Sequence, residues 1–210
     1  MKKIMIALSI LIVIGILGFV AYKAFLAPKV PQEFIEAHNK ISNLSKDVET
    51  LTDPNGAPDF EKPMNSEDYN GAIKAIDETL ANENKALEKL KIVDSELAKL
   101  KILSDKITNA KAKEASLNRI NYGEKENVAK IGYIALRIQM LDSLKEIIGH
   151  INKDTSLFTA ADEKAVNDLS AKITEIKNQT DKASSELESV QSQYKAAEEE
   201  FMSAANLSKV

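Results

Sequence analysis

The stretch VNDLSAKITEIKNQTDKASSELESVQSQYKAAEEEFMSA, residues 166–204, decides the fold of this chain. Its apolar and small residues recur at alternating steps of three and four without a slip: Val166, Leu169, Ile173, Ile176, Thr180, Ala183, Leu187, Val190, Tyr194, Ala197, Phe201 and Ala204. Because an α-helix has about 3.6 residues per turn, this spacing places them all in one coiled-coil seam. Thr159, followed three residues later by Asp162, is a variant of the capping box and predicts a helix over about 159–206.

Apolar residues at helical spacing predict three more helices before this one, over about 31–51, 66–118 and 124–152. Ser66 is a candidate cap for the second of them, and the triplet Asn121-Tyr122-Gly123 is a candidate stop signal at its end. Residues 52–65 contain three prolines and an Asn-Gly pair, which is typical of a connecting linker. The predicted fold class is all-α, an elongated antiparallel helical bundle or coiled coil.

Those bounds predict helices of unequal length, about 78 Å, 43 Å and 70 Å for the last three at 1.5 Å per residue. In an up-down-up arrangement the helix over 159–206 then overshoots its neighbours by roughly 25 Å and leaves part of its seam uncovered. We therefore expect a protein partner to bind this C-terminal helix, with Tyr194 and Phe201 as the contact residues. The sequence leaves a homo-oligomer open but disfavours a simple parallel dimer, because none of the flanking pairs, such as Lys172 with Lys177, would attract.

The N-terminal residues 1–27 predict a single transmembrane helix. Lys2 and Lys3 precede an uncharged run from Ile4 to Tyr22, which spans roughly 28 Å as a helix and is longer than the apolar part of a usual signal peptide. Ala21, Ala24 and Ala27 each have an aromatic residue, Phe19, Tyr22 and Phe25, at the position where a cleavage site needs a second small residue. We therefore expect an uncleaved signal-anchor, with cleavage as the alternative. The basic end favours a cytoplasmic N-terminus, which places residues 28–210 outside the cytoplasm, in the periplasm or at the cell surface.

Composition narrows the function classes. The chain is 44% hydrophobic, 29% charged and 5% aromatic, and it has no cysteine; these values suit long helices rather than disorder and leave no thiol for a lipid anchor or disulfide. Its bias toward Lys, Ile and Asn is typical of an AT-rich bacterial genome. The net charge of -4, with both signs interspersed, gives no basic stripe for nucleic acid.

No glycine-rich phosphate loop, GxSxG, HExxH or Cys-His arrangement occurs in the sequence. We therefore expect no enzymatic activity, no cofactor and no metal site, and we interpret His38 and His150 as solvated or boundary residues on separate helices. The sequence favours a membrane-anchored helical scaffold, spacer or adaptor of the cell envelope that acts through helix-helix contacts. The alternative is an extracytoplasmic ligand-sensing or ligand-binding bundle. Against it, we expect the helix faces to lack a cluster of Arg or aromatic residues that could bind a ligand.

Overall fold

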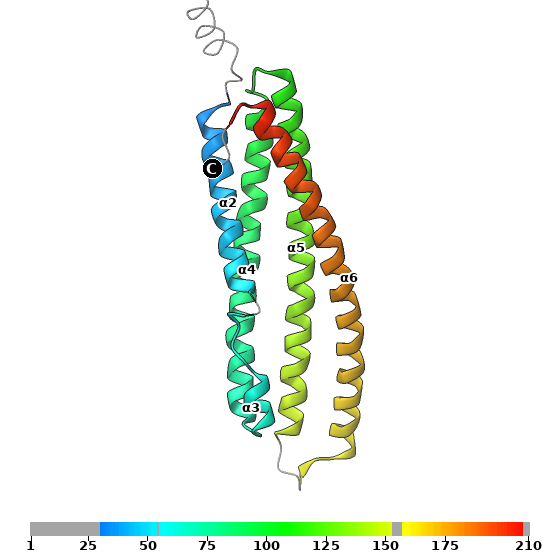
Figure 1. Ribbon diagram of the computed structural model, residues 1–210. Coiled ribbons are helices and arrows are strands. Elements are labelled where there is room, and N and C mark those ends of the chain that lie inside the picture. The colour runs from blue at the N-terminus through cyan, green and yellow to red at the C-terminus, as the bar shows by residue number, and fades with distance from the viewer. Residues whose placement is uncertain (1–29, 54, 153–156, 208–210) are drawn as a thin grey trace, which may run out of the picture.

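The computed structural model describes residues 30–53, 55–152 and 157–207, and these form an elongated bundle of helices (Figure 1). The helices within these residues are α2 (Gln32–Thr52), α3 (Glu61–Asn65), α4 (Tyr69–Ser104), α5 (Ala110–Ile151) and α6 (Ala160–Ala204). The four long helices alternate in direction along the chain, and α3 lies at the lower end in Figure 1. The all-α, bundle-like architecture predicted from the sequence is confirmed for the described residues.

The predicted membrane anchor, residues 1–27, lies outside the described residues. Within the part of the chain that the structure describes, none of the helices combines the length and the apolar character needed to cross a membrane. Val30 and Leu207, the first and last of the described residues, both pack against the same upper core cluster. The bundle therefore starts and ends at one pole.

The turn between the second and third long helices lies earlier than predicted. The helix expected over 66–118 ends at Ser104, and α5 begins at Ala110. The Asn109 side chain accepts a hydrogen bond from the backbone N–H of Ala112 at 2.9 Å and caps α5. Ile107 continues the apolar spacing of α4, but it is buried within the turn itself, at 4% exposed. Its apolar character made the turn resemble uninterrupted helix.

The triplet Asn121-Tyr122-Gly123 is not a stop signal, and this prediction is wrong. All three residues lie inside α5, and Gly123 is buried. A Cβ atom at Gly123 would lie 3.0 Å from Cδ2 of Leu97 on α4 and 3.3 Å from Cε2 of Tyr194 on α6. Glycine is therefore placed here because two neighbouring helices approach the α5 backbone closely.

This shift of the turn makes the long helices similar in length. Helices α4, α5 and α6 have 36, 42 and 45 residues, or about 54 Å, 63 Å and 68 Å. The predicted 25 Å overshoot is consequently wrong, and the end of α6 packs into the upper core, where Ala197 and Phe201 are buried. Helix α6 packs along α5, α5 on α4, and α4 on α2.

The helix starts follow local capping chemistry. At α6 the predicted capping box is present: Thr159 accepts from the backbone N–H of Asp162, and the Asp162 side chain accepts from that of Thr159. At α4 the cap is Asp68, whose side chain accepts from the backbone N–H of Gly71, and not the predicted Ser66. The linker expected over 52–65 contains the short helix α3, which packs against α4.

Candidate functional site

A stripe of polar or small residues runs along the inward face of α5. Ser116, Arg119, Gly123 and Asn127 are all buried there, and the last three follow one another at four-residue spacing. That spacing places side chains one above another on one helix face. The upper half of the bundle therefore encloses groups that would ordinarily face water, which makes it the part of the described structure that needs a functional explanation.

Arg119 is the centre of this region and is only 1% exposed. Its Nη2 atom donates to the Tyr194 hydroxyl at 2.8 Å and faces Nδ1 of His38 at 2.5 Å, while Oε1 of Glu198 lies 3.8 Å away. The guanidinium also lies over the rings of Tyr194 and Phe201, with 5.5 Å and 5.8 Å to the ring centres, in a cation–π arrangement. We call these five residues the Arg119 cluster.

The cluster fixes the protonation of His38. A guanidinium can only donate, so Nδ1 of His38 must accept, and the ring proton sits on Nε2. Burial, assisted by the Arg119 charge, lowers the pKa of His38 to about 4. Nε2 of His38 faces Oε1 of Glu198 at 3.7 Å. At neutral pH the histidine is therefore an uncharged link between Arg119 and Glu198.

Tyr194 is also affected by its surroundings. Burial raises the pKa of the Tyr194 phenol, and the Arg119 charge opposes this effect. The hydroxyl therefore keeps its proton at neutral pH. Because its oxygen accepts from Arg119, the hydroxyl proton is left to donate elsewhere.

A cavity of about 160 Å³ lies beside the cluster, lined by residues of all four long helices. Helix α2 contributes His38 and Glu49, α4 contributes Leu97, α5 contributes Asn127, and α6 contributes Tyr194, among others. His38 and Glu198 also line a wider groove of about 600 Å³ between α2 and α6. The cavity therefore adjoins the surface along the side where α2 faces α6.

Helix α5 adds the polar side chains of Asn127, Glu126 and Lys130 to the cavity. Asn127 is 3% exposed; its Nδ2 donates to the carbonyl oxygen of Leu90 at 3.1 Å, and its Oδ1 has no hydrogen-bond partner among the described residues. Glu126 and Lys130 form an ion pair at 2.8 Å, with side chains 13% and 11% exposed. The cavity thus combines a satisfied ion pair with an unsatisfied amide oxygen.

A second buried ion pair lies lower in the bundle. Nη2 of Arg137 is 2.6 Å from Oε1 of Glu83, which is 1% exposed, and Nη1 of Arg137 donates to the carbonyl oxygen of Thr52 at 3.1 Å. Burial raises the pKa of Glu83, and the Arg137 charge opposes it. This pair ties α4 and α5 to the end of α2, so we assign it a structural role.

The residues predicted to bind a partner, Tyr194 and Phe201, are brought together, but inside the bundle. Phe201 is 1% exposed and its ring centre is 5.3 Å from that of Phe34 on α2. Tyr194 is half-buried against Arg119. The expectation that an uncovered seam exposes them is wrong, because α6 ends level with its neighbours. Both belong to the Arg119 cluster, and the expected lack of an Arg and aromatic cluster is also wrong.

The two histidines, interpreted from the sequence as solvated or boundary residues, lie in different surroundings. His38 is part of the Arg119 cluster, whereas His150 lies at the lower turn, where its Nδ1 is 2.9 Å from Oδ1 of Asp162. Among the residues that the structure describes, no group of three or more His, Cys, Asp or Glu side chains is placed to hold a metal ion. In the turn that follows α2, the Asp53 side chain accepts a hydrogen bond from the backbone N–H of Asn55 at 2.9 Å, as in an ordinary Asx turn.

One signal for the cluster was present in the sequence. Arg119 and Arg137 are the only arginines in the chain, whose other basic residues are lysines, and both take part in the buried pairs described above. Arginine suits enclosed sites better than lysine because its planar group binds several acceptors and stacks on rings.

Comparisons with protein-family models, curated proteins and solved structures found no match.

Proposed function

We propose that this protein is a non-enzymatic helical scaffold, spacer or adaptor of the cell envelope, held in a membrane by residues 1–27. The observation that supports it most directly is the contact between Phe34 and Phe201, whose ring centres are 5.3 Å apart. It joins the first helix after the proposed anchor to the end of the last helix. The bundle would then stand on its anchor by one pole and extend about 65 Å from it, as the length of α5 and α6 implies.

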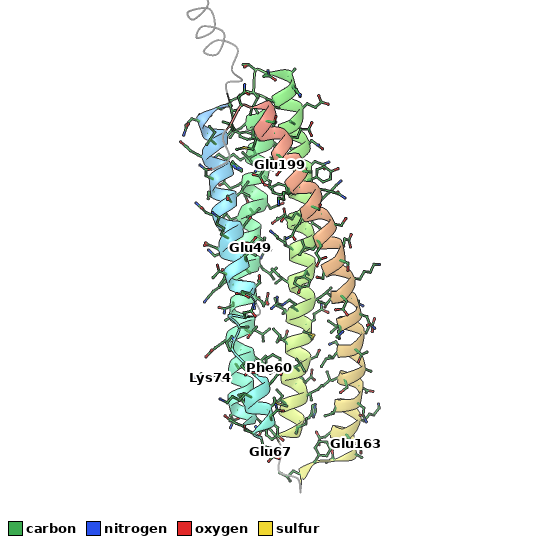
Figure 2. The ribbon with its side chains drawn as sticks, viewed as in Figure 1. Glu49, Phe60, Glu67, Lys74, Glu163 and Glu199 are labelled. Carbon is green, nitrogen blue, oxygen red and sulfur yellow. The ribbon has the colours of Figure 1, made fainter. Side chains whose placement is uncertain are left out.

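The adaptor part of the proposal needs a surface that a partner can reach. Because the α6 seam with Tyr194 and Phe201 is packed inside the bundle, a partner of the C-terminal helix would contact the solvent-facing side of α6. That side is strongly charged, with Glu199 and Glu200 exposed near the upper end; Figure 2 shows Glu199 there. A partner with a basic surface fits this side best.

The experiment that tests the proposal uses the full chain with a proximity-labelling enzyme fused to its C-terminus. We expect the protein to stay in the membrane fraction after alkaline extraction and to label extracytoplasmic neighbours. The double variant Leu11→Arg, Ile14→Arg should leave the membrane, because each Arg at the centre of a span costs about 2.5–3.5 kcal/mol. The matched control Leu11→Val, Ile14→Val should stay. Recovery of the unaltered chain in the soluble fraction, or labelling of cytoplasmic proteins alone, would overturn the proposal.

The second candidate function is the binding of a small ligand by the bundle. It is favoured by the cavity beside the Arg119 cluster, to which all four long helices contribute. Sites between the helices of bundles commonly place a few polar groups in an otherwise packed interior.

A further inference from the structure

We propose that the cavity beside the Arg119 cluster, which all four long helices line, is a binding site for a small organic cation, such as a primary amine or a diamine. This goes beyond the scaffold function, which needs no ligand. The site is made by residues that lie far apart in the sequence, from His38 on α2 to Glu198 on α6. It exists only when the bundle is assembled.

The first argument is the amide oxygen of Asn127. The residue is 3% exposed and lines the cavity, and its Oδ1 has no hydrogen-bond partner among the described residues, whereas its Nδ2 is bound to Leu90. A buried acceptor left unpaired costs about 1–3 kcal/mol. A donor that hydrogen-bonds to this oxygen from the cavity would remove that cost, and an ammonium group carries three donors.

The second argument is which groups of the lining are already engaged. Lys130 is paired with Glu126 at 2.8 Å, and Nε2 of His38 faces Glu198 at 3.7 Å. Glu49 lines the cavity from α2 and forms no ion pair with any residue that the structure describes. Figure 2 shows it about midway along the bundle. Of the groups that remain, the Asn127 amide oxygen and the Glu49 carboxylate only accept, whereas the hydroxyls of Tyr194, Ser42 and Ser45 can donate as well as accept.

The third argument is the charge of the lining. Three carboxylates, those of Glu49, Glu126 and Glu198, face one ammonium group, that of Lys130, and His38 is uncharged at neutral pH. Arg119 lies behind His38 and Tyr194 and offsets the charge of Glu198 at 3.8 Å. One negative charge is left over, which favours a cation and disfavours an anion.

The size of the cavity limits the ligand. Its volume of about 160 Å³ equals about five water molecules at 30 Å³ each. An alkyl amine or diamine of four carbons is of this size, and its methylene groups would contact Leu97 and the ring of Tyr194. The groove that shares His38 and Glu198 with the cavity gives a route from solvent.

The test is calorimetric titration of the full-length protein, in detergent, with three probes of similar length. We expect 1,4-diaminobutane to bind, 1,4-butanediol to bind at least about tenfold more weakly because charge-assisted hydrogen bonds are lost, and butyrate not to bind. Failure of 1,4-diaminobutane to bind at millimolar concentration would show a cavity that holds water only and would overturn the proposal. Equal affinity for the diol would overturn the assignment to a cation.

Two variants locate the site. Asn127→Leu keeps the shape of the side chain and removes the acceptor, so binding of 1,4-diaminobutane should be lost. Glu49→Gln, a change at the exposed mouth that leaves the core intact, should weaken binding by about two- to fivefold. The matched control Glu188→Gln makes the same change at an exposed position of α6 and should leave affinity unaltered. If Asn127→Leu does not fold, Glu49→Gln against Glu188→Gln decides, and equal affinities of these two variants would overturn the proposal.

Discussion

The two ends of α6 carry the same heptad pattern but lie in different surroundings. Near the upper end Ala197 and Phe201 are 4% and 1% exposed, because α2 and α5 both reach this part of the seam. Between residues 166 and 190 only Ile176 of the seam is buried, and the others are half-exposed. There α6 packs along α5 alone. The repeat predicts which side of a helix faces inward, and the number of neighbouring helices decides how deeply that side is buried.

The two ends also differ in what they enclose. The lower cluster is apolar and holds Ala72, Ile76, Leu141 and Ile148. The upper half encloses Arg119 and Asn127, each with at least one polar atom that has no partner among the described residues. Unsatisfied buried polar groups reduce stability. Buried polar groups are not confined to the upper half, because Glu83, lower in the bundle, is 1% exposed and paired with Arg137. What distinguishes the upper half is that its buried polar groups adjoin a cavity.

The largest effect should come from removing the phenylalanine that closes the upper end. Phe201→Ala should lower the free energy of unfolding by about 3–5 kcal/mol, because it leaves a cavity against Phe34 and Arg119. The matched control is Phe158→Ala at the lower end, where the side chain is 41% exposed and the expected loss is below about 1 kcal/mol. Urea unfolding of the full-length chain measures both. Similar losses at the two sites would contradict the difference between the ends.

The helix types and the inward side of α6 could be predicted because they depend on local spacing. The turn over 105–109 could not, since it contains neither Gly nor Pro and its Ile107 continues the apolar pattern of α4. At Gly123 the error was the opposite one, because the sequence predicted a helix end where α5 continues. The glycine lets Leu97 and Tyr194 approach, which depends on residues distant in sequence. One misplaced turn then gave wrong helix lengths and a false overshoot.

The candidate site was even less accessible to sequence reasoning. His38, Arg119 and Tyr194 are brought together across separations of 75 to 81 residues. No short motif encodes such a contact, because each residue only needs to lie on the inward face of its own helix. The rarity of arginine in a lysine-rich chain was the usable signal, and it indicates burial without identifying the neighbours.

A fall in pH should weaken the upper end through His38. Its pKa is about 4 in the folded protein against 6.5 for the free side chain, so between these values the unfolded chain binds more protons. Stability from this group is full above pH 6.5 and is lost as the pH falls toward 4. Between pH 7 and pH 5 the expected loss is about 2 kcal/mol.

The variant His38→Gln isolates this effect, since its amide oxygen can still accept from Arg119 but does not titrate in this range. Unfolding free energies of the variant and the unaltered chain should be measured at both pH values, so that the carboxylates common to both cancel. The variant should lose about 2 kcal/mol less on acidification. An identical pH dependence would show that His38 is not held neutral by its surroundings.

Gly123 and Gly132, two of the three glycines within α5, should respond in opposite ways to a larger side chain. Gly123→Leu forces atoms against Leu97 and Tyr194 and should cost about 1–3 kcal/mol. A Cβ atom at Gly132 would have no atom of the described residues within 4 Å, so Gly132→Leu should instead stabilise α5 by about 0.5–1 kcal/mol through helix propensity. Thermal melting of the full chain distinguishes the two. A loss at both positions would mean that α5 and α6 approach each other more closely at Gly132 than this open space implies.

The smallest expected effect concerns the upper turn, which is capped by one side chain, whereas the lower turn has the reciprocal bonds of Thr159 and Asp162. Asn109→Ala removes the bond to the backbone N–H of Ala112 and should cost about 1 kcal/mol. Asn121→Ala, at the residue where the sequence suggested a break, should be neutral or stabilise by a few tenths of a kcal/mol, since alanine favours an exposed helix position. Urea unfolding can resolve this difference. A larger loss for Asn121→Ala than for Asn109→Ala would indicate that the turn lies at residues 121–123 and that the helix lengths are unequal, as the sequence suggested.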